Sequence, residues 1–228
     1  MESQDELVKT TPLHSRLAMG IRRAGRVLLD QLYPPVCLCC DAPTGMADTL
    51  CAKCFAALRP ITAPLCPVLG LPFEVALGPD ALSAEAIADP PPFERARAAL
   101  VYNDLAGTLV SRLKYGDRPE LARFCARLMA GAGHELWADR PILVPVPLHA
   151  ARLRERRYNQ SAELAQQLAR LTGLECEMGL VRRVRKTRQQ VGLSGDGRAR
   201  NVAGAFAVDI ERLAGGAGRS VVRGGWGG

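Results

Sequence analysis

Eight cysteines are the residues of this 228-residue chain whose type and spacing point most directly to chemistry. Five of them fall in the run C-L-C-C-D-A-P-T-G-M-A-D-T-L-C-A-K-C. Cys37 with Cys40, and Cys51 with Cys54, form two pairs of C-x2-C spacing, which lets two thiolates reach one ion from a tight turn. Together the pairs predict a tetrahedral site of four sulfurs, for which Zn²⁺ is favoured because it is not redox-active. A four-cysteine site has no open position, so the predicted zinc is structural.

The remaining cysteines carry weaker predictions. Cys39 is an extra thiol inside the first pair and could replace a neighbour as a ligand, whereas Cys66, Cys125 and Cys176 are isolated and typical of core residues. The amino end is acidic and polar, without a secretory signal, and this favours metal over disulfides. With no apolar run of about 20 residues, the sequence predicts a cytoplasmic protein without a membrane span.

A second informative stretch opens with I-L-V-P-V-P-L-H at Ile142–His149 and continues with R-E-R-R-Y-N-Q at Arg154–Gln160. The apolar, β-branched opening predicts a buried strand that the prolines end. A helix is expected over Tyr158–Leu171, because leucines recur at helical spacing and Gly173 follows. A strand that leads through a loop into a helix start is where α/β proteins place ligands, and the N–H groups there attract anions.

Lys114 ends a predicted helix, Leu105–Leu113, beside a glycine, and could meet a phosphate as a point charge. A lysine is also favoured near any helix C-terminus by the dipole, and Asn159 could be a plain N-cap.

The distribution of charge along the chain is relevant to whether these residues bind an anion. Residues 150–200 hold 12 Arg or Lys and five Asp or Glu, so this segment alone matches the net charge of +7 of the whole chain. Either an anionic ligand or an arginine-rich solvated surface accounts for this excess.

The motifs V-P-V-P-L-H, R-x-x-Y-N-Q and T-x-x-Q-x-x-L-S-x-x-x-R-x-x-N-V-x-G-A-F, the last ending at Phe206, resemble the ComF family over roughly residues 28–208. This family is competence-associated and has a type I phosphoribosyltransferase fold behind a zinc-binding amino-terminal part. The resemblance implies a role in DNA uptake during natural transformation, partners in the competence machinery, and a phosphoribosyl diphosphate ligand with Mg²⁺. It also implies six substrate- or phosphate-binding residues: Lys114, Arg156, Asn159, Gln160, Gln190 and Arg198.

The predicted fold class is therefore α/β, a type I phosphoribosyltransferase-like, mostly parallel sheet with a small four-cysteine zinc module. Residues 1–92 are expected to hold an amphipathic helix (His14–Leu32), the zinc module and a proline-rich connector with a short helical piece at Ala81–Ala88. Residues 93–208 are expected to form the α/β domain, with a strand at Arg97–Tyr102 and a helix at Pro119–Met129. Residues 209–228 form a Gly-rich tail, and no internal repeat is evident in the sequence.

The sequence also departs from the family pattern. Leu69 stands where relatives often have the second cysteine of C-P-x-C-G, and Arg157 replaces a glycine. Beyond Val208 the family fold requires a strand with an acidic pair and a T-T-G turn. This chain instead has a Gly-rich tail with too few apolar residues for a core strand, which indicates a truncated or frameshifted domain, incomplete at its C-terminus. Catalysis is expected to be impaired and enzyme status is left open. The alternatives are a noncatalytic zinc-containing protein that binds single-stranded DNA, and a degenerate, poorly folded product.

Overall fold

A computed structural model describes residues 34–78, 80–115, 118–156, 158–190, 192–210, 212 and 221–224. The helices are α2 (Ala52–Ala56), α3 (Ala84–Ala88), α4 (Asp104–Tyr115), α5 (Pro119–Ala132), the 3₁₀ helix η1 (His134–Trp137), α6 (Ala150–Arg156), α7 (Gln160–Thr172) and α8 (Gly195–Val202). The strands are β1 (Ile142–Pro145), β2 (Val181–Arg183), β3 (Phe206–Val208) and β4 (Val221–Gly224). The helix predicted at His14–Leu32 lies outside the described residues.

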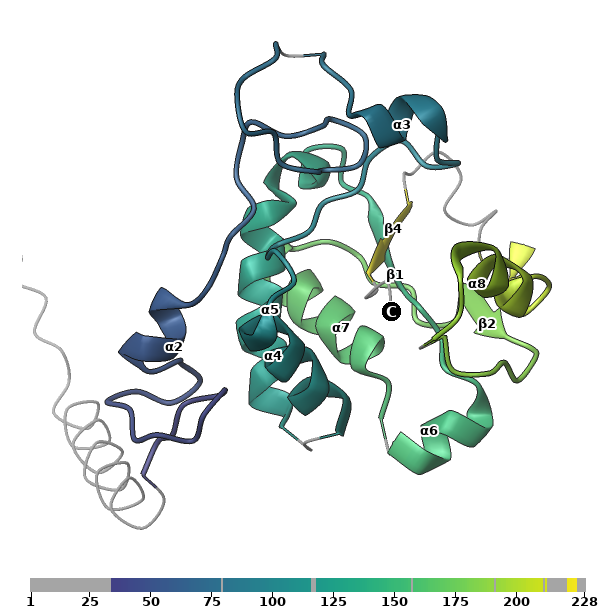
Figure 1. Ribbon diagram of the computed structural model, residues 1–228. Helices are drawn as coiled ribbons and strands as arrows, with labels where there is room; N and C mark the ends of the chain where they lie inside the picture. The colour runs from purple at the N-terminus through teal and green to yellow at the C-terminus, as the bar shows by residue number, and fades with distance from the viewer. Residues whose placement is uncertain are drawn as a thin grey trace, which may run out of the picture.

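Strand β1 lies at the centre of the α/β part of the molecule (Figure 1). All four of its residues are buried, as its run of apolar residues predicts. On one side it pairs parallel with β4, and on the other Leu143 exchanges backbone hydrogen bonds of 2.9 Å with Glu175 and Glu177. The chain after Pro145 therefore leaves a strand that is held on both edges, and this fixes where the following loop begins.

The tail contains a strand, which corrects the expectation that it supplies none. Val221 pairs with Ile142 and Gly224 with Pro145, so β4 runs parallel to β1 along its whole length. Ladder hydrogen bonds are made by the backbone, so a segment with two β-branched residues can pair although it is too short and Gly-rich to be recognised from apolar content. The count of apolar residues was the wrong criterion.

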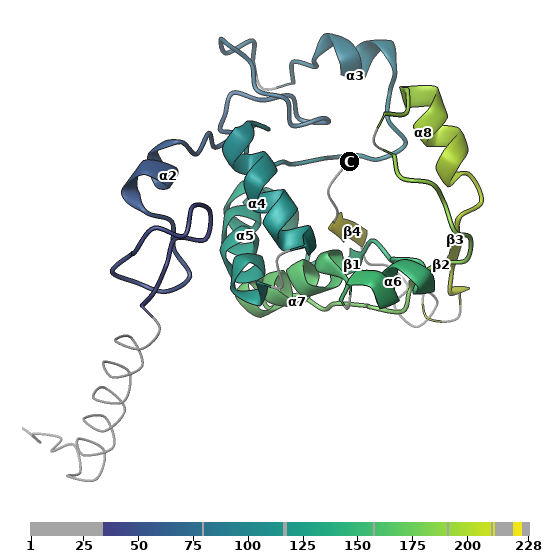
Figure 2. The same cartoon turned by 60° about the horizontal axis from the view of Figure 1, so that its bottom comes forward.

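Helices α4, α5 and α7 pack between β1 and the zinc-ligand region, as both views show (Figure 2). The predictions for these three helices are confirmed to within a few residues. Helix α7 has a complete set of end signals, since Asn159 caps its start and Gly173 ends it in the left-handed conformation, with φ 69°. Leu164 and Leu168 on α7 are almost fully buried against the neighbouring helices, and this face sets the position of the helix start beside β1.

The first cysteine-rich segment shares a core with the helices. Cys37, Leu38 and Cys54 belong to the same buried cluster as Leu109 and Leu121 of α4 and α5. At the surface beside this core, Asp41 accepts two hydrogen bonds from Arg112, at 2.8 and 2.6 Å. Asp41 also forms an ion pair with Arg118 at 2.9 Å. The hydrogen bonds and charge of Arg112, with a contribution from Arg118, hold the pKa of Asp41 below its ordinary value.

The sheet is smaller than the resemblance implies. Among the described residues the strands form two pairs, β1 with β4 in parallel and β2 with β3 antiparallel. The prediction of a strand at Arg97–Tyr102 is wrong, because this segment forms no strand and does not pair with β1. It instead makes an isolated antiparallel bridge between Leu100 and Pro60 of the connector. The described residues thus form a mixed helix-and-strand fold, and a broad parallel sheet is not seen in them. No described helix combines the length and the apolar character needed to cross a membrane.

Candidate metal centre and phosphate-binding site

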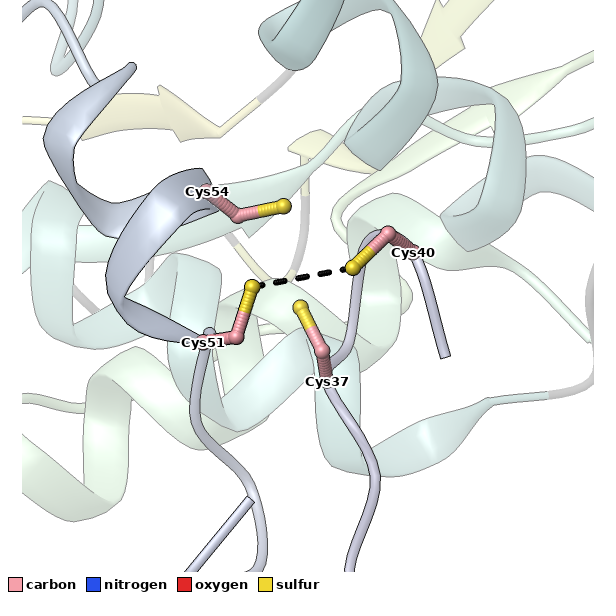
Figure 3. A group of neighbouring side chains, drawn as sticks. All are labelled: Cys37, Cys40, Cys51 and Cys54. Carbon is pink, nitrogen blue, oxygen red and sulfur yellow. Dashed lines mark hydrogen bonds between the residues drawn. The ribbon is translucent and has the colours of Figure 1, made fainter. Parts of the chain in front are cut away.

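The four cysteines predicted as zinc ligands lie together (Figure 3). Their sulfur atoms are all within 4.8 Å of one another, and the sulfurs of Cys40 and Cys51 are 3.6 Å apart. Tetrahedral zinc with Zn–S bonds of about 2.3 Å requires sulfur–sulfur distances of about 3.8 Å, so the group needs only small side-chain movements to close around an ion. Four thiols and no oxygen or nitrogen donor form the set that suits structural Zn²⁺.

Backbone geometry prepares this group for metal. The N–H of Cys39 points at the sulfur of Cys37 from 3.4 Å, and Cys51 is the N-cap residue of α2, which places Cys54 on the first turn facing the group. Burial alone would raise the pKa of Cys37, but backbone N–H groups aimed at its sulfur lower it to about 6. Cys39 is buried beside the group without belonging to it, so the described geometry gives it no ligand role.

A second constellation lies where three segments of the chain meet. The side-chain amide of Gln160, at the start of α7, donates to the carbonyl of Lys114 at 3.1 Å, and the hydroxyl of Tyr158 donates to the carbonyl of Leu113. Arg156 ends α6 and donates to the Tyr115 hydroxyl at 3.1 Å, with its guanidinium 5.0 Å from the ring centroid. These bonds hold the end of α4 against the start of α7, so the backbone of Lys114 and the guanidinium of Arg156 both contact Gln160 although 42 positions separate them in the sequence.

Asn159 connects the loop after β1 to the start of α7. Its side-chain oxygen accepts the N–H of Ser161 at 3.1 Å as an N-cap, and its amide nitrogen donates to the carbonyl of Val146 at 3.1 Å. One side chain thus caps α7 and holds the loop after β1 on the helix start. Asn159 bonds backbone groups, and Gln160 donates to a backbone carbonyl and accepts from the Arg156 guanidinium at 3.4 Å, so the structure gives both residues a positioning role, while Lys114 and Arg156 carry the charge.

The electrostatics of this place favour an anion. No Asp or Glu forms an ion pair with Lys114 or Arg156 among the residues that the structure describes, whereas Arg95, Arg97 and Arg112 elsewhere are each paired. The first turn of α7 contributes N–H groups of its own. Two cations and a helix start beside a strand-end loop form an arrangement that can hold a phosphate group.

Gln190 and Arg198 are not brought to this place by any described contact. The carbonyl of Gln190 accepts the N–H of Leu193 at 3.1 Å, and Arg198 on α8 donates through Nε to the carbonyl of Leu193 at 3.1 Å. Both residues therefore shape the turn that leads into α8. Their predicted ligand role remains a prediction.

An arginine cluster lies beside β2, within the basic segment 150–200. The guanidinium of Arg183 packs on the ring of Phe206 at 5.3 Å and donates to Thr187, while its Nε is buried with no partner in the described structure. Burial lowers the pKa of Arg183, and the nearby charges of Arg152 and Arg185 lower it further. The excess of arginine is evident in the sequence, but the charge interaction between Arg152 of α6 and Arg183 of β2 depends on how the fold places these two elements.

These features define a class of protein in which a structural zinc module shares its core with a helix-and-strand domain. In that domain a cationic site lies at the end of a buried parallel strand. A family model described as a double zinc ribbon domain matches residues 28–87. The DNA utilization protein YhgH of Salmonella typhimurium is 33% identical over 186 residues, which cover 78% of this chain and 79% of the relative. The chain belongs to the ComF family.

Two further relatives agree with this assignment over shorter spans. Competence protein F of Haemophilus influenzae is 32% identical over 117 residues, about half of each chain (49% of this one and 51% of the relative). Competence protein ComFC of Bacillus subtilis is 28% identical over 154 residues, covering 61% of this chain and 64% of the relative. No solved structure matches this chain.

Proposed function

We propose that this chain takes part in DNA uptake or use, and that its part is to bind a phosphate-bearing polyanion, single-stranded DNA, without catalysing phosphoribosyl transfer. The relatives are named as competence or DNA utilization proteins, and this supports the first part. The observation that carries the second part is that Gln160, at the start of α7, contacts both the Arg156 guanidinium and the backbone carbonyl of Lys114, with no carboxylate paired to either cation in the described structure.

The arginine cluster supports a polymeric ligand. A single phosphate group needs one cationic site, whereas a nucleic-acid backbone presents a phosphate at every nucleotide. Arg152, Arg183 and Arg185 provide a second cationic position, and in both ribbon views α6 and β2 lie on the same side of β1 (Figures 1 and 2). Tyr115 is exposed beside the first position and offers a ring on which a base can stack. Two cationic positions and an aromatic surface suit a single strand better than a small diphosphate.

The sequence of the tail supports the absence of phosphoribosyl transfer. In a parallel pair the carboxyl ends of the strands meet at one edge, so Gly224, the last residue of β4, lies at the edge where the loop after β1 begins. The resemblance implies an acidic pair and a hydroxyl-rich turn at such a strand end. This chain has Gly225, Trp226 and two further glycines, and no adjacent acidic pair occurs in residues 209–228. Polar groups aimed at a developing positive charge supply much of the rate in such reactions, and residues 209–228 do not supply an adjacent acidic pair of this kind.

The test is a fluorescence anisotropy titration of the zinc-loaded full chain with a labelled single-stranded oligonucleotide between about 50 and 200 mM salt. Lys114→Ala combined with Arg156→Ala should weaken binding and flatten the dependence of log affinity on log salt by about 0.7 for each lost phosphate contact. Arg170→Ala is the matched control, because this exposed arginine lies in the last turn of α7, at the end opposite the site. Salt-independent binding, or equal loss in the control, would contradict the proposal.

Phosphoribosyl diphosphate with Mg²⁺ is the competing ligand. Calorimetric titration with this compound is expected to give no micromolar binding, and incubation with it is expected to release no diphosphate. Micromolar binding that Arg156→Ala abolishes would show that the site is built for the small ligand.

A further inference from the structure

The first knuckle of the cysteine-rich region, residues 36–43, has a well-defined backbone pattern. Val36 and Pro43 form an antiparallel bridge, and the N–H of Cys37 donates to the carbonyl of Ala42 at 2.8 Å. The N–H of Asp41 donates back to the carbonyl of Cys37 at 3.2 Å, and Asp41 itself is left-handed, with φ 60°. This is the tight turn that presents Cys37 and the cysteine three positions later to one ion.

The same pattern occurs again 29 positions further along the chain, at residues 65–72. Leu65 and Pro72 form an antiparallel bridge, and the N–H of Cys66 donates to the carbonyl of Leu71 at 2.8 Å. The N–H of Gly70 donates back to the carbonyl of Cys66 at 2.8 Å, and Gly70 is left-handed, with φ 67°. Each of the four backbone features given above for the first knuckle has its counterpart here.

The helices that follow the knuckles match as well. Helices α2 and α3 are each five residues long. The residue before the first helix is Cys51 and the residue before the second is Ser83, both extended N-caps. The third residue of each helix is buried, and it is Cys54 in α2 and Ala86 in α3. The ligand positions of the first unit therefore correspond to Cys66, Leu69, Ser83 and Ala86 in the second.

The match to a double zinc ribbon model implies two such units, and we propose that in this chain only the first binds Zn²⁺ while the second keeps the fold without metal. Leucine and alanine have no donor atom, and a lone thiol with a serine hydroxyl does not make a zinc site. The whole region matched by the double zinc ribbon model thus contains one four-cysteine group among its described residues.

In the second unit, hydrogen bonds to the sulfur of Cys66 make the connection that the metal would make in the first unit. The sulfur of Cys66 accepts the N–H of Ser83 at 3.4 Å and the N–H of Leu69 at 3.5 Å, so it links the knuckle to the start of α3, the same two parts that metal links in the first unit. The Ser83 hydroxyl then accepts the N–H of Ala86 at 3.3 Å. Burial alone would raise the pKa of Cys66, but the N–H groups aimed at its sulfur lower it to about 7. Cys66 is fully buried, so its role is within the fold.

The test measures zinc by elemental analysis on the purified full chain. One zinc per chain is expected for the unchanged protein and for Cys66→Ser, and none for Cys51→Ser. Two zinc per chain, or loss of zinc in Cys66→Ser, would overturn the proposal.

A gain-of-metal variant tests the correspondence of positions directly. Leu69→Cys, Ser83→Cys and Ala86→Cys together complete a second set of four thiols with Cys66 and should raise the count from one to two. Co²⁺ substitution reports the same change, since the thiolate charge-transfer band should double. A variant whose circular dichroism matches the unchanged protein but which still binds one metal would show that the positions do not correspond.

Discussion

Asn159 offers the sharpest test of how the phosphate-binding site is held together. Its oxygen caps α7 and its amide nitrogen holds the carbonyl of Val146, so two substitutions separate the two functions. Asn159→Ala removes both bonds, at a cost of about 1 kcal/mol for the cap and about 1 kcal/mol for the second hydrogen bond. Asn159→Asp keeps the cap, loses the donor and places a carboxylate against a carbonyl oxygen, at a cost of about 1 kcal/mol.

The two variants should rank differently in two assays. Urea unfolding, followed by circular dichroism with zinc present, should show the alanine variant as the less stable. Single-stranded DNA binding should show the aspartate variant as the weaker binder, because its negative charge lies beside Lys114 and Arg156. Ser83→Ala is the control, since it removes the cap of α3 in the zinc module and should reduce stability without changing DNA affinity. The same rank order in both assays would refute this account of Asn159.

Three further predictions concern the zinc module. Cys51→Ser should release metal and make the first knuckle sensitive to limited proteolysis; full zinc retention would contradict the ligand assignment. Gly70→Ala should lower the free energy of unfolding by at least about 1–2 kcal/mol, because the backbone there is left-handed and a Cβ would lie 2.4 Å from a backbone oxygen. Gly45→Ala is the control, since a Cβ at that position contacts no atom within 4 Å and the thermal midpoint should stay unchanged. Asp41→Asn and Arg112→Ala should each lower the thermal midpoint and together lower it by less than the sum, and strict additivity would show that the ion pair does not link the module to α4.

Local signals in the sequence predicted the zinc ligands and the segments around the second site. C-x2-C spacing depends only on what a tight turn can reach, and for this reason Cys37 and its three partners could be identified without a fold. The burial of β1 and the ends of α7 follow from side-chain type and from the cap residues Asn159 and Gly173. In each case the residues that decide the structure are neighbours in the chain.

The features that the sequence did not predict depend on distant backbone contacts. The repeat of the knuckle retains only a cysteine and a proline at matching positions, C-L-C-C-D-A-P against C-P-V-L-G-L-P, so the hydrogen bonds reveal it and the letters do not. The charge interaction of Arg152 with Arg183 requires α6 and β2 to lie near each other, which no local sequence pattern predicts. The pairing of β4 with β1 could not be predicted either, because which strands pair depends on the tertiary structure.

The parallel pair of β1 and β4 has a consequence for how the chain acquires its structure. Ile142 and its partner Val221 are 79 residues apart, so this edge of β1 stays open during synthesis until residues 221–224 have left the ribosome. Closing so long a loop is slow compared with forming the knuckles and helices, whose contacts are local. In the meantime a buried apolar strand presents unpaired N–H and C=O groups, the kind of edge that pairs with other chains. Newly made protein is therefore expected to depend on chaperones or dilution at this stage, and its yield on refolding should fall as protein concentration rises.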